Sequence, residues 1–264
     1  MQLLQKLNGC SFMIEEAFGH RVSRETFEEI LPDYNDIDNQ LTKYKGTNNR
    51  LANILLNSIM NNEEKRRLEK AFFGDNGWYR KINGAGMIDL KLAAMSLEAT
   101  NNIFTFDKDL EERILDTINL KSKEEQLLMM SCYIKQKAVT YATLYNYLHN
   151  VRKTDKMSIT LYRGINTPFK KEKYMFSGME SWTTNLNIAY RFARSGGFVL
   201  EKEYPIDQIF AGKRSTFKNQ ANCGYEHRGL YIRRESEMIV ENYETIFDCS
   251  EGKGVRFAVD KEIY

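Results

Sequence analysis

Two glutamates one residue apart, Glu235 and Glu237, stand directly before the apolar residues 238–240. Because alternate side chains of a β-strand point to the same side, both carboxylates would face one cleft, roughly 7 Å apart. Two negative charges so close together repel each other, so the pattern requires an explanation. The ordinary explanation is a sheet edge with ion-paired carboxylates, and the alternative is a catalytic pair. The spacing alone does not decide between them.

Hydroxyl groups and an arginine that could act with such a pair precede it in the chain. Ser181 and Thr183 lie two residues apart, so in an extended segment their hydroxyls would share a face and could orient a carboxylate. Arg163 ends a predicted strand, where its guanidinium fork could bind a phosphate or ribose oxygen. Gly164 would let the backbone approach closely. Each feature also has an ordinary explanation, a surface ion pair for the arginine and helix capping for the hydroxyls.

The glutamate spacing occurs a second time, at Glu201 and Glu203. This earlier pair follows Ser181 closely, so that one helix and one strand fill the interval and no substrate-facing loop fits between them. We therefore expect the later pair to carry any catalytic role.

Taken in chain order, the segments that contain Arg163, Ser181 and Glu237 resemble the arginine–serine–glutamate signature of the mono-ADP-ribosyltransferases that are related to bacterial and phage toxins. The resemblance is carried by residues 161–164, 181–193 and 235–240. It covers residues 158–260. One position departs from the family pattern, because Trp182 stands where members often carry a small hydroxyl residue. The resemblance places Trp182 in the wall around nicotinamide, whose shape this residue would alter.

The resemblance implies an enzyme that consumes NAD⁺ as a substrate, needs no metal and moves ADP-ribose onto a macromolecule. Cleavage of the nicotinamide–ribose bond develops positive charge on the ribose, as in glycoside hydrolysis. By resemblance, Glu237 stabilises that charge, Ser181 holds Glu237 and Thr183 supports the site. Arg163 and Gly164 would contribute to the binding of NAD⁺. Nicotinamide is already cationic in NAD⁺, so its departure needs no general acid.

The acceptor of ADP-ribose is left open between two classes. Glu235 would face the acceptor, and in the family a glutamate here accompanies transfer to protein arginine, whose protonated guanidinium needs a base. The preceding loop, 222–234, would recognise the acceptor, with Tyr225 and Tyr231 as candidate contacts. Residues 213–234 hold six Lys and Arg against one Glu, which suits the phosphates of RNA or DNA. A tyrosine of the loop could then stack on a base. The same charges could instead solvate the loop or bind the NAD⁺ diphosphate.

The elements that must position these residues change in type near residue 155. Before it, apolar residues recur at helical spacing, and Ser122 with Glu125 forms a capping-box pattern ahead of the longest helical stretch. After it, short β-rich segments alternate with glycines and prolines. Helices are predicted at 23–32, 51–60, 63–70, 88–103, 106–118, 127–151 and 187–194, and strands at 158–162, 197–200, 238–240 and 254–259.

This pattern predicts an α+β fold in which a helical N-terminal region, 1–155, precedes a β-rich catalytic core, 156–264. By resemblance, the core is a split sheet like that of the ADP-ribosyltransferases. The pattern does not decide whether the two parts are separate domains or one continuous body. The helical region has no predicted role.

Several other function classes find little support in the sequence. The three histidines lie far apart, and no metal-binding motif or P-loop is present. Gly84 and Gly86 lack the third glycine of a dinucleotide fingerprint. Four scattered cysteines fit a reducing compartment, and no segment is typical of a signal peptide or a membrane span. We therefore expect a cytoplasmic protein without a membrane partner.

Two further alternatives stay open at this point. The chain could be an inactive binding module with a transferase-like fold. If it is active, a neutralising partner protein is plausible, because such an activity would harm the cell that makes it.

Overall fold

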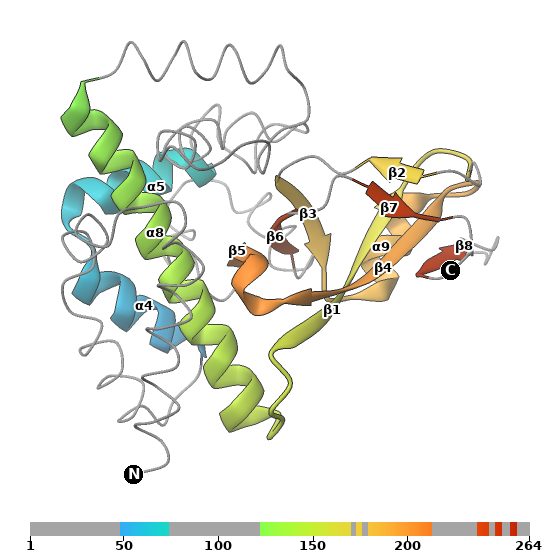
Figure 1. Ribbon diagram of the computed structural model, residues 1–264, viewed down its shortest axis with the longest axis horizontal. Helices are drawn as coiled ribbons and strands as arrows, with labels where there is room; N and C mark the ends of the chain where they lie inside the picture. Colours follow the sequence, from blue (N-terminus) through green and yellow to red (C-terminus); the bar gives the residue numbers. More distant parts are fainter. Residues whose placement is uncertain are drawn as a thin grey trace.

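The computed structural model of this chain describes residues 48–73, 122–169, 173–175, 179–212, 237–242, 246–249 and 254–257. Figure 1 shows three helices gathered at one end of the molecule beside strand β5 (Ile209–Gly212), with the other strands and a fourth helix beyond it. The helices are α4 (Asn48–Ile59), α5 (Asn62–Phe73), α8 (Lys123–Asn146) and α9 (Leu186–Ala193). A π-helical turn, Tyr147–Val151, continues α8.

Local sequence signals fix where the first helices begin. The Ser122 hydroxyl accepts a hydrogen bond from the Glu125 backbone N–H at 3.2 Å, so the predicted cap of α8 is confirmed. Helix α5 has a reciprocal cap that the sequence analysis missed. There the Asn61 side chain accepts from the Glu64 N–H at 2.9 Å, and the Glu64 carboxylate accepts from the Asn61 N–H at 2.9 Å. The helices predicted at 51–60, 63–70 and 127–151 are confirmed, and those predicted at 23–32, 88–103 and 106–118 lie outside the described residues.

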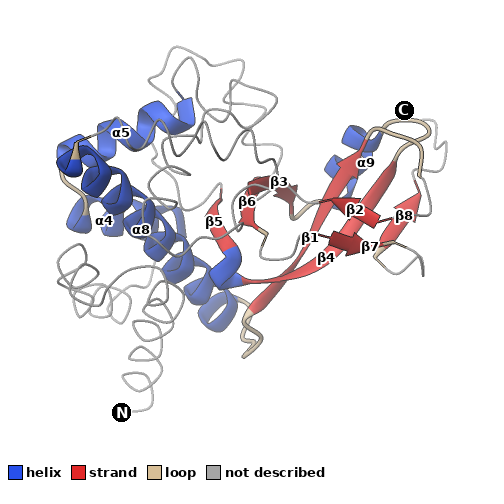
Figure 2. Cartoon of the chain, turned by 45° about the horizontal axis from the view of Figure 1, so that its top comes forward, coloured by secondary structure: helices blue, strands red, loops and turns tan. Residues whose placement is uncertain are grey.

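The strands form one six-stranded sheet in the order β5-β6-β3-β1-β4-β8 and a separate pair, β2-β7, and every recorded pairing is antiparallel (Figure 2). Their bounds are β1 Ser158–Ile165, β2 Lys173–Met175, β3 Met179–Thr183, β4 Phe198–Pro205, β6 Glu237–Glu241, β7 Ile246–Asp248 and β8 Val255–Phe257. A short 3₁₀ helix, Ile206–Gln208, joins β4 to β5. The strands predicted at 158–162, 197–200 and 238–240 correspond to β1, β4 and β6. The strand predicted at 254–259 corresponds to β8, and its residues 258–259 lie outside the described residues. The predicted α+β class is confirmed.

The six-stranded sheet consists of two halves that meet at one position. β1 pairs with β4 along its whole length, and β3 pairs with β6 along its whole length. Between β1 and β3, in contrast, a single register pair is recorded, Tyr162 with Thr183. The half β5-β6-β3 and the half β1-β4-β8 therefore part on either side of this pair. We call this place the split.

Helix α9 packs on β1 so closely that a glycine is required beneath it. A Cβ atom at Gly164 would lie 2.0 Å from the Ala189 carbonyl oxygen, a separation that no side chain tolerates. The helix begins at Asn185, whose side chain accepts a hydrogen bond from the Asn187 N–H at 3.0 Å. The turn between β3 and α9 is thereby fixed directly after Thr183.

One hydrophobic core runs from the helices into the sheet. The Tyr133 ring of α8 stacks on Phe210 of β5 with centroids 5.1 Å apart, and the Thr140 hydroxyl donates to the Phe210 carbonyl oxygen at 2.8 Å. Leu51 of α4 and Trp182 of β3 belong to the same cluster of buried side chains. Within the described residues, the helices and the sheet thus share a core. The predicted division into domains at residue 155 stays a prediction.

Candidate active site

Two of the predicted site residues touch through their side chains. The Ser181 hydroxyl of β3 donates a hydrogen bond to Oε1 of Glu237, the first residue of β6. Glu237 is buried, with 8% of its surface exposed. The contact joins residues that are far apart in the sequence, and it depends on the pairing of β3 with β6 in which Thr183 lies opposite Glu237. A carboxylate of fixed orientation results.

A row of side chains crosses the sheet on the side of this contact. Tyr162 lies opposite Thr183, and Thr183 lies opposite Glu237. Directly opposite residues of paired strands project to the same face, and so does Ser181, two residues before Thr183. The Thr183 hydroxyl accepts a hydrogen bond from the Asn185 N–H at 3.1 Å, which ties the row to the start of α9. The predicted common face of Ser181 and Thr183 is confirmed.

Arg163 reaches this site at the split. Its Nη1 donates to the main-chain carbonyl oxygen of Ser181 at 2.6 Å, and its side chain is 25% exposed. Strand alternation points Arg163 away from the face of Tyr162, so the arginine approaches from the other side of the sheet. The structure therefore brings Arg163, Ser181 and Glu237 into one chain of contacts, in which the arginine binds the backbone of the serine and not its hydroxyl.

Two residues that the sequence analysis missed hold Arg163 in place. Glu180 is buried, and its Oε2 atom lies 3.6 Å from Nε of Arg163. The Tyr174 hydroxyl accepts from Arg163 Nε at 3.3 Å and donates to Glu180 Oε1 at 3.3 Å. Glu180 precedes Ser181 in the sequence, so its position beside a predicted site residue was a signal that could have identified it. Tyr174 comes from the short strand β2, and no sequence pattern connects it with the arginine.

These contacts shift the acid–base behaviour of the cluster. Burial raises the pKa of the Tyr174 hydroxyl, and the Arg163 guanidinium opposes that shift. Burial lowers the pKa of the Arg163 guanidinium, but the neighbouring Glu180 carboxylate and Tyr174 outweigh it, so the net shift is upward. Arg163 is therefore charged and Tyr174 is neutral at physiological pH.

Two other residues that were predicted to contact NAD⁺, Trp182 and Gly164, have close contacts within the fold. Trp182 is buried in the core, where its ring meets that of Tyr204 edge-on with centroids 5.0 Å apart. It lies between Ser181 and Thr183 in the strand and so faces the opposite side. The close backbone approach at Gly164, which was expected for a ligand, is made by α9. Trp182 therefore lies behind the site, whereas Gly164, two residues after Tyr162, lies on the face of the site and allows α9 to pack there.

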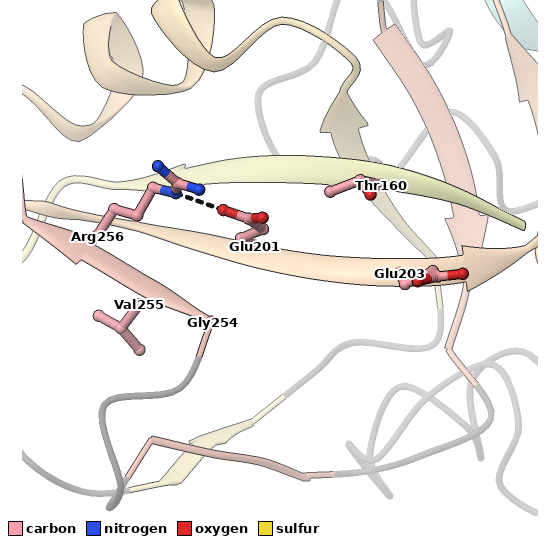
Figure 3. A pocket seen from close by; sticks show the side chains of 6 residues that line it. All are labelled: Thr160, Glu201, Glu203, Gly254, Val255 and Arg256. Carbon is pink, nitrogen blue, oxygen red and sulfur yellow. Dashed lines mark hydrogen bonds and ion pairs between the residues drawn. The ribbon is translucent and has the colours of Figure 1, made fainter.

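The earlier glutamate pair lies in a different setting, shown in Figure 3. Glu201 pairs with Arg256 of β8, and Glu203 pairs with Lys156 Nζ at 2.8 Å and accepts from the Ser158 hydroxyl. They line an open pocket of about 430 Å³. The hydrogen bonds from Lys156 and Ser158 lower the pKa of Glu203. These are the ion-paired carboxylates of an exposed sheet region.

The remaining predicted site residues, Glu235, Tyr225 and Tyr231, lie outside the described residues, as does the loop 222–234. Among the residues that the structure describes, no group of three or more His, Cys, Asp or Glu side chains could hold a metal ion. No helix in the same part of the chain is long and apolar enough to cross a membrane.

Comparison with known proteins gives no relative: no family model, no curated protein and no solved structure matches this chain.

Proposed function

We propose that this chain is a mono-ADP-ribosyltransferase that cleaves NAD⁺ at the nicotinamide–ribose bond and transfers ADP-ribose to a macromolecule. The observation that carries the proposal is the hydrogen bond from the Ser181 hydroxyl to the buried Glu237 carboxylate. Arg163 is bound to the main chain of the same serine. The split between β1 and β3 supports a core of the split-sheet type that the sequence resemblance implies.

The reaction needs a fixed negative charge beside the sugar. When the bond between ribose C1′ and the pyridinium nitrogen breaks, its electron pair goes to the nitrogen and nicotinamide leaves as a neutral molecule. Positive charge then develops on C1′ and the ring oxygen. A carboxylate that is already oriented stabilises this charge without having to reorganise. Glu237, held by Ser181, is suited to this role.

Arg163 is suited to hold the dinucleotide. Its Nε and Nη1 bind Tyr174, Glu180 and the Ser181 carbonyl oxygen, whereas no partner is recorded for Nη2 in the described part of the chain. A guanidinium fixed on one side offers its other nitrogen to a phosphate or ribose oxygen. The Arg163 side chain is 25% exposed. Strand alternation points it to the face opposite Glu237, so the proposal requires the ligand to reach Arg163 at the split.

Protein arginine is the first candidate acceptor, because Glu235 precedes Glu237 at the spacing that accompanies arginine transfer in the family. The basic excess in residues 213–234 favours a nucleic-acid base as the second candidate. By resemblance, the biological setting is that of a toxin or effector.

Two assays test the proposal. In the first, the wild-type chain releases nicotinamide from NAD⁺ and the Glu237→Ala variant does not; a wild type without release, as expected for an inactive binding module, contradicts the proposal. In the second, cell lysate is labelled through NAD⁺ and divided between protease and nuclease. Label that protease removes supports a protein acceptor, and label that only nuclease removes excludes protein arginine in favour of a nucleic-acid base.

A further inference from the structure

A buried ion pair connects the C-terminal end of strand β6 to helix α8. The Lys137 ammonium group of α8 pairs with the Glu241 carboxylate, and both side chains are almost completely buried, with 2% and 0% of their surfaces exposed. The Tyr133 hydroxyl of α8 donates to the other oxygen of the same carboxylate. Glu241 closes the strand that Glu237 opens.

Stability alone is a weak reason for this arrangement. Removing two charges from water is unfavourable, and well-packed apolar side chains of similar volume often stabilise a fold as well or better. Breaking such a pair by removing one partner, in contrast, is strongly destabilising, because the other charge stays buried. A buried ion pair therefore strongly favours the one alignment of helix α8 and strand β6 in which its two charges meet.

The alignment concerned is the register of β6. Its residues 238–240 are all apolar, so their packing distinguishes poorly between neighbouring registers. The ladder to β5 is irregular as well, since it shifts between Ile209 and Ala211. A slip of two residues along the strand would keep every side chain on its face but move Glu237 by roughly 6–7 Å. The same slip would separate Lys137 from the Glu241 carboxylate.

Helix α8 can fix this register only if its own position on the sheet is fixed, and its contacts with β5 meet that condition. Thr140 donates to the Phe210 carbonyl oxygen at 2.8 Å, and Tyr133 stacks on the Phe210 ring. The helix is thus held on strand β5 by two contacts on either side of Lys137 along the chain.

We propose that Lys137 and Glu241 are positioning residues, which fix β6 so that Glu237 meets Ser181. The helical layer is then part of the catalytic apparatus and not an appended module. This inference rests on the proposed function.

The test compares nicotinamide release by the wild-type chain, Lys137→Met, Glu241→Gln and the double variant Lys137→Met with Glu241→Met. The single variants lose stability because one buried partner remains, whereas the double variant replaces the pair by apolar side chains and regains stability. We expect the double variant to melt near the wild-type temperature with kcat still lowered roughly 10- to 100-fold, since small displacements of a reacting group have effects of this size. KM for NAD⁺ should change less than kcat, because Arg163 is untouched.

Lys135→Met is the matched control, since it removes another α8 cation whose partner lies on α5. Its kcat should equal that of the wild type in the folded protein. A double variant that regains both stability and wild-type kcat overturns the inference, because the pair is then merely structural. If the double variant does not fold, kcat is measured for the folded fraction of Glu241→Gln instead. A lowered kcat then supports the inference, and a wild-type kcat overturns it. A wild type that releases no nicotinamide overturns the proposed function itself, which distinguishes the two failures.

Discussion

Each half of the sheet contains a serine hydroxyl that donates a hydrogen bond to a glutamate on the neighbouring strand, yet the two pairs are suited to different tasks. In the pair Ser181–Glu237 the glutamate is buried. In the pair Ser158–Glu203 the glutamate side chain is 46% exposed and also binds Lys156. At Glu203, the ammonium group of Lys156 neutralises the charge of an exposed carboxylate.

Burial adds to this difference. A charge in a site from which water is excluded interacts with a developing positive charge more strongly than an exposed charge does. The same residue types at the same kind of contact therefore give a candidate catalytic group in one half and a surface ion pair in the other. The environment, and not the Glu-x-Glu spacing, distinguishes them.

The largest expected effect comes from neutralising the two glutamates in parallel. Glu237→Gln should lower the rate of nicotinamide release at least about 100-fold, because an amide cannot stabilise the cationic ribose. Glu203→Gln should leave the rate unchanged. Steady-state assays of both folded variants check this, and equal losses in the two would remove the distinction between the pairs.

The two serines provide a smaller and more specific comparison. Ser181→Ala should lower kcat roughly 10- to 100-fold, since Glu237 keeps its charge but loses the hydrogen bond that orients it. Ser158→Ala should not change kcat, because Lys156 still holds Glu203. Wild-type kcat in Ser181→Ala would mean that the hydroxyl has no part in orienting the carboxylate.

The two arginine–glutamate pairs extend the comparison to binding. Glu180→Gln should raise KM for NAD⁺ about 10-fold with a smaller change in kcat, because Arg163 loses the carboxylate that fixes it for ligand binding. Arg256→Ala, at the exposed pair with Glu201, should leave both constants unchanged. Loss of kcat at unchanged KM in Glu180→Gln would assign Arg163 to the chemical step instead.

The smallest effect concerns pH and the exposed pair. Because Lys156 and Ser158 lower the pKa of Glu203 in the folded state, the carboxylate stabilises the fold above its unfolded-state pKa. That contribution is lost as the pH falls through the folded-state pKa. The difference in unfolding free energy between wild type and Glu203→Gln should therefore narrow in acid, as followed by denaturant titrations. A difference that stays constant with pH would contradict the lowered pKa.

Local features of this fold could be predicted from the sequence, because they depend on residues near one another in the chain. The caps at Ser122 and Asn185 and the shared face of Ser181 and Thr183 are of this kind. The inward direction of Trp182 follows from the same alternation and was open to prediction.

Features that depend on distant partners could not be predicted. The contact of Tyr174 with Arg163 requires strand β2, which has only three residues and no periodic pattern. The burial of Lys137 against Glu241 requires the docking of α8 on the sheet, and a lysine in a helix is otherwise expected at the surface. The sequence resemblance implies a split sheet, but the place of the split is a property of strand pairing, which the sequence of a single strand does not reveal.

The central claim is that the Glu237 carboxylate lies against the sugar from which nicotinamide departs. The most direct measurement is a crystal structure of the Glu237→Gln variant with NAD⁺ bound. The account predicts the nicotinamide ribose beside position 237 and Ser181, with Arg163 on a phosphate or ribose oxygen. A dinucleotide bound in the pocket of Glu201 and Arg256, away from Ser181, would contradict it.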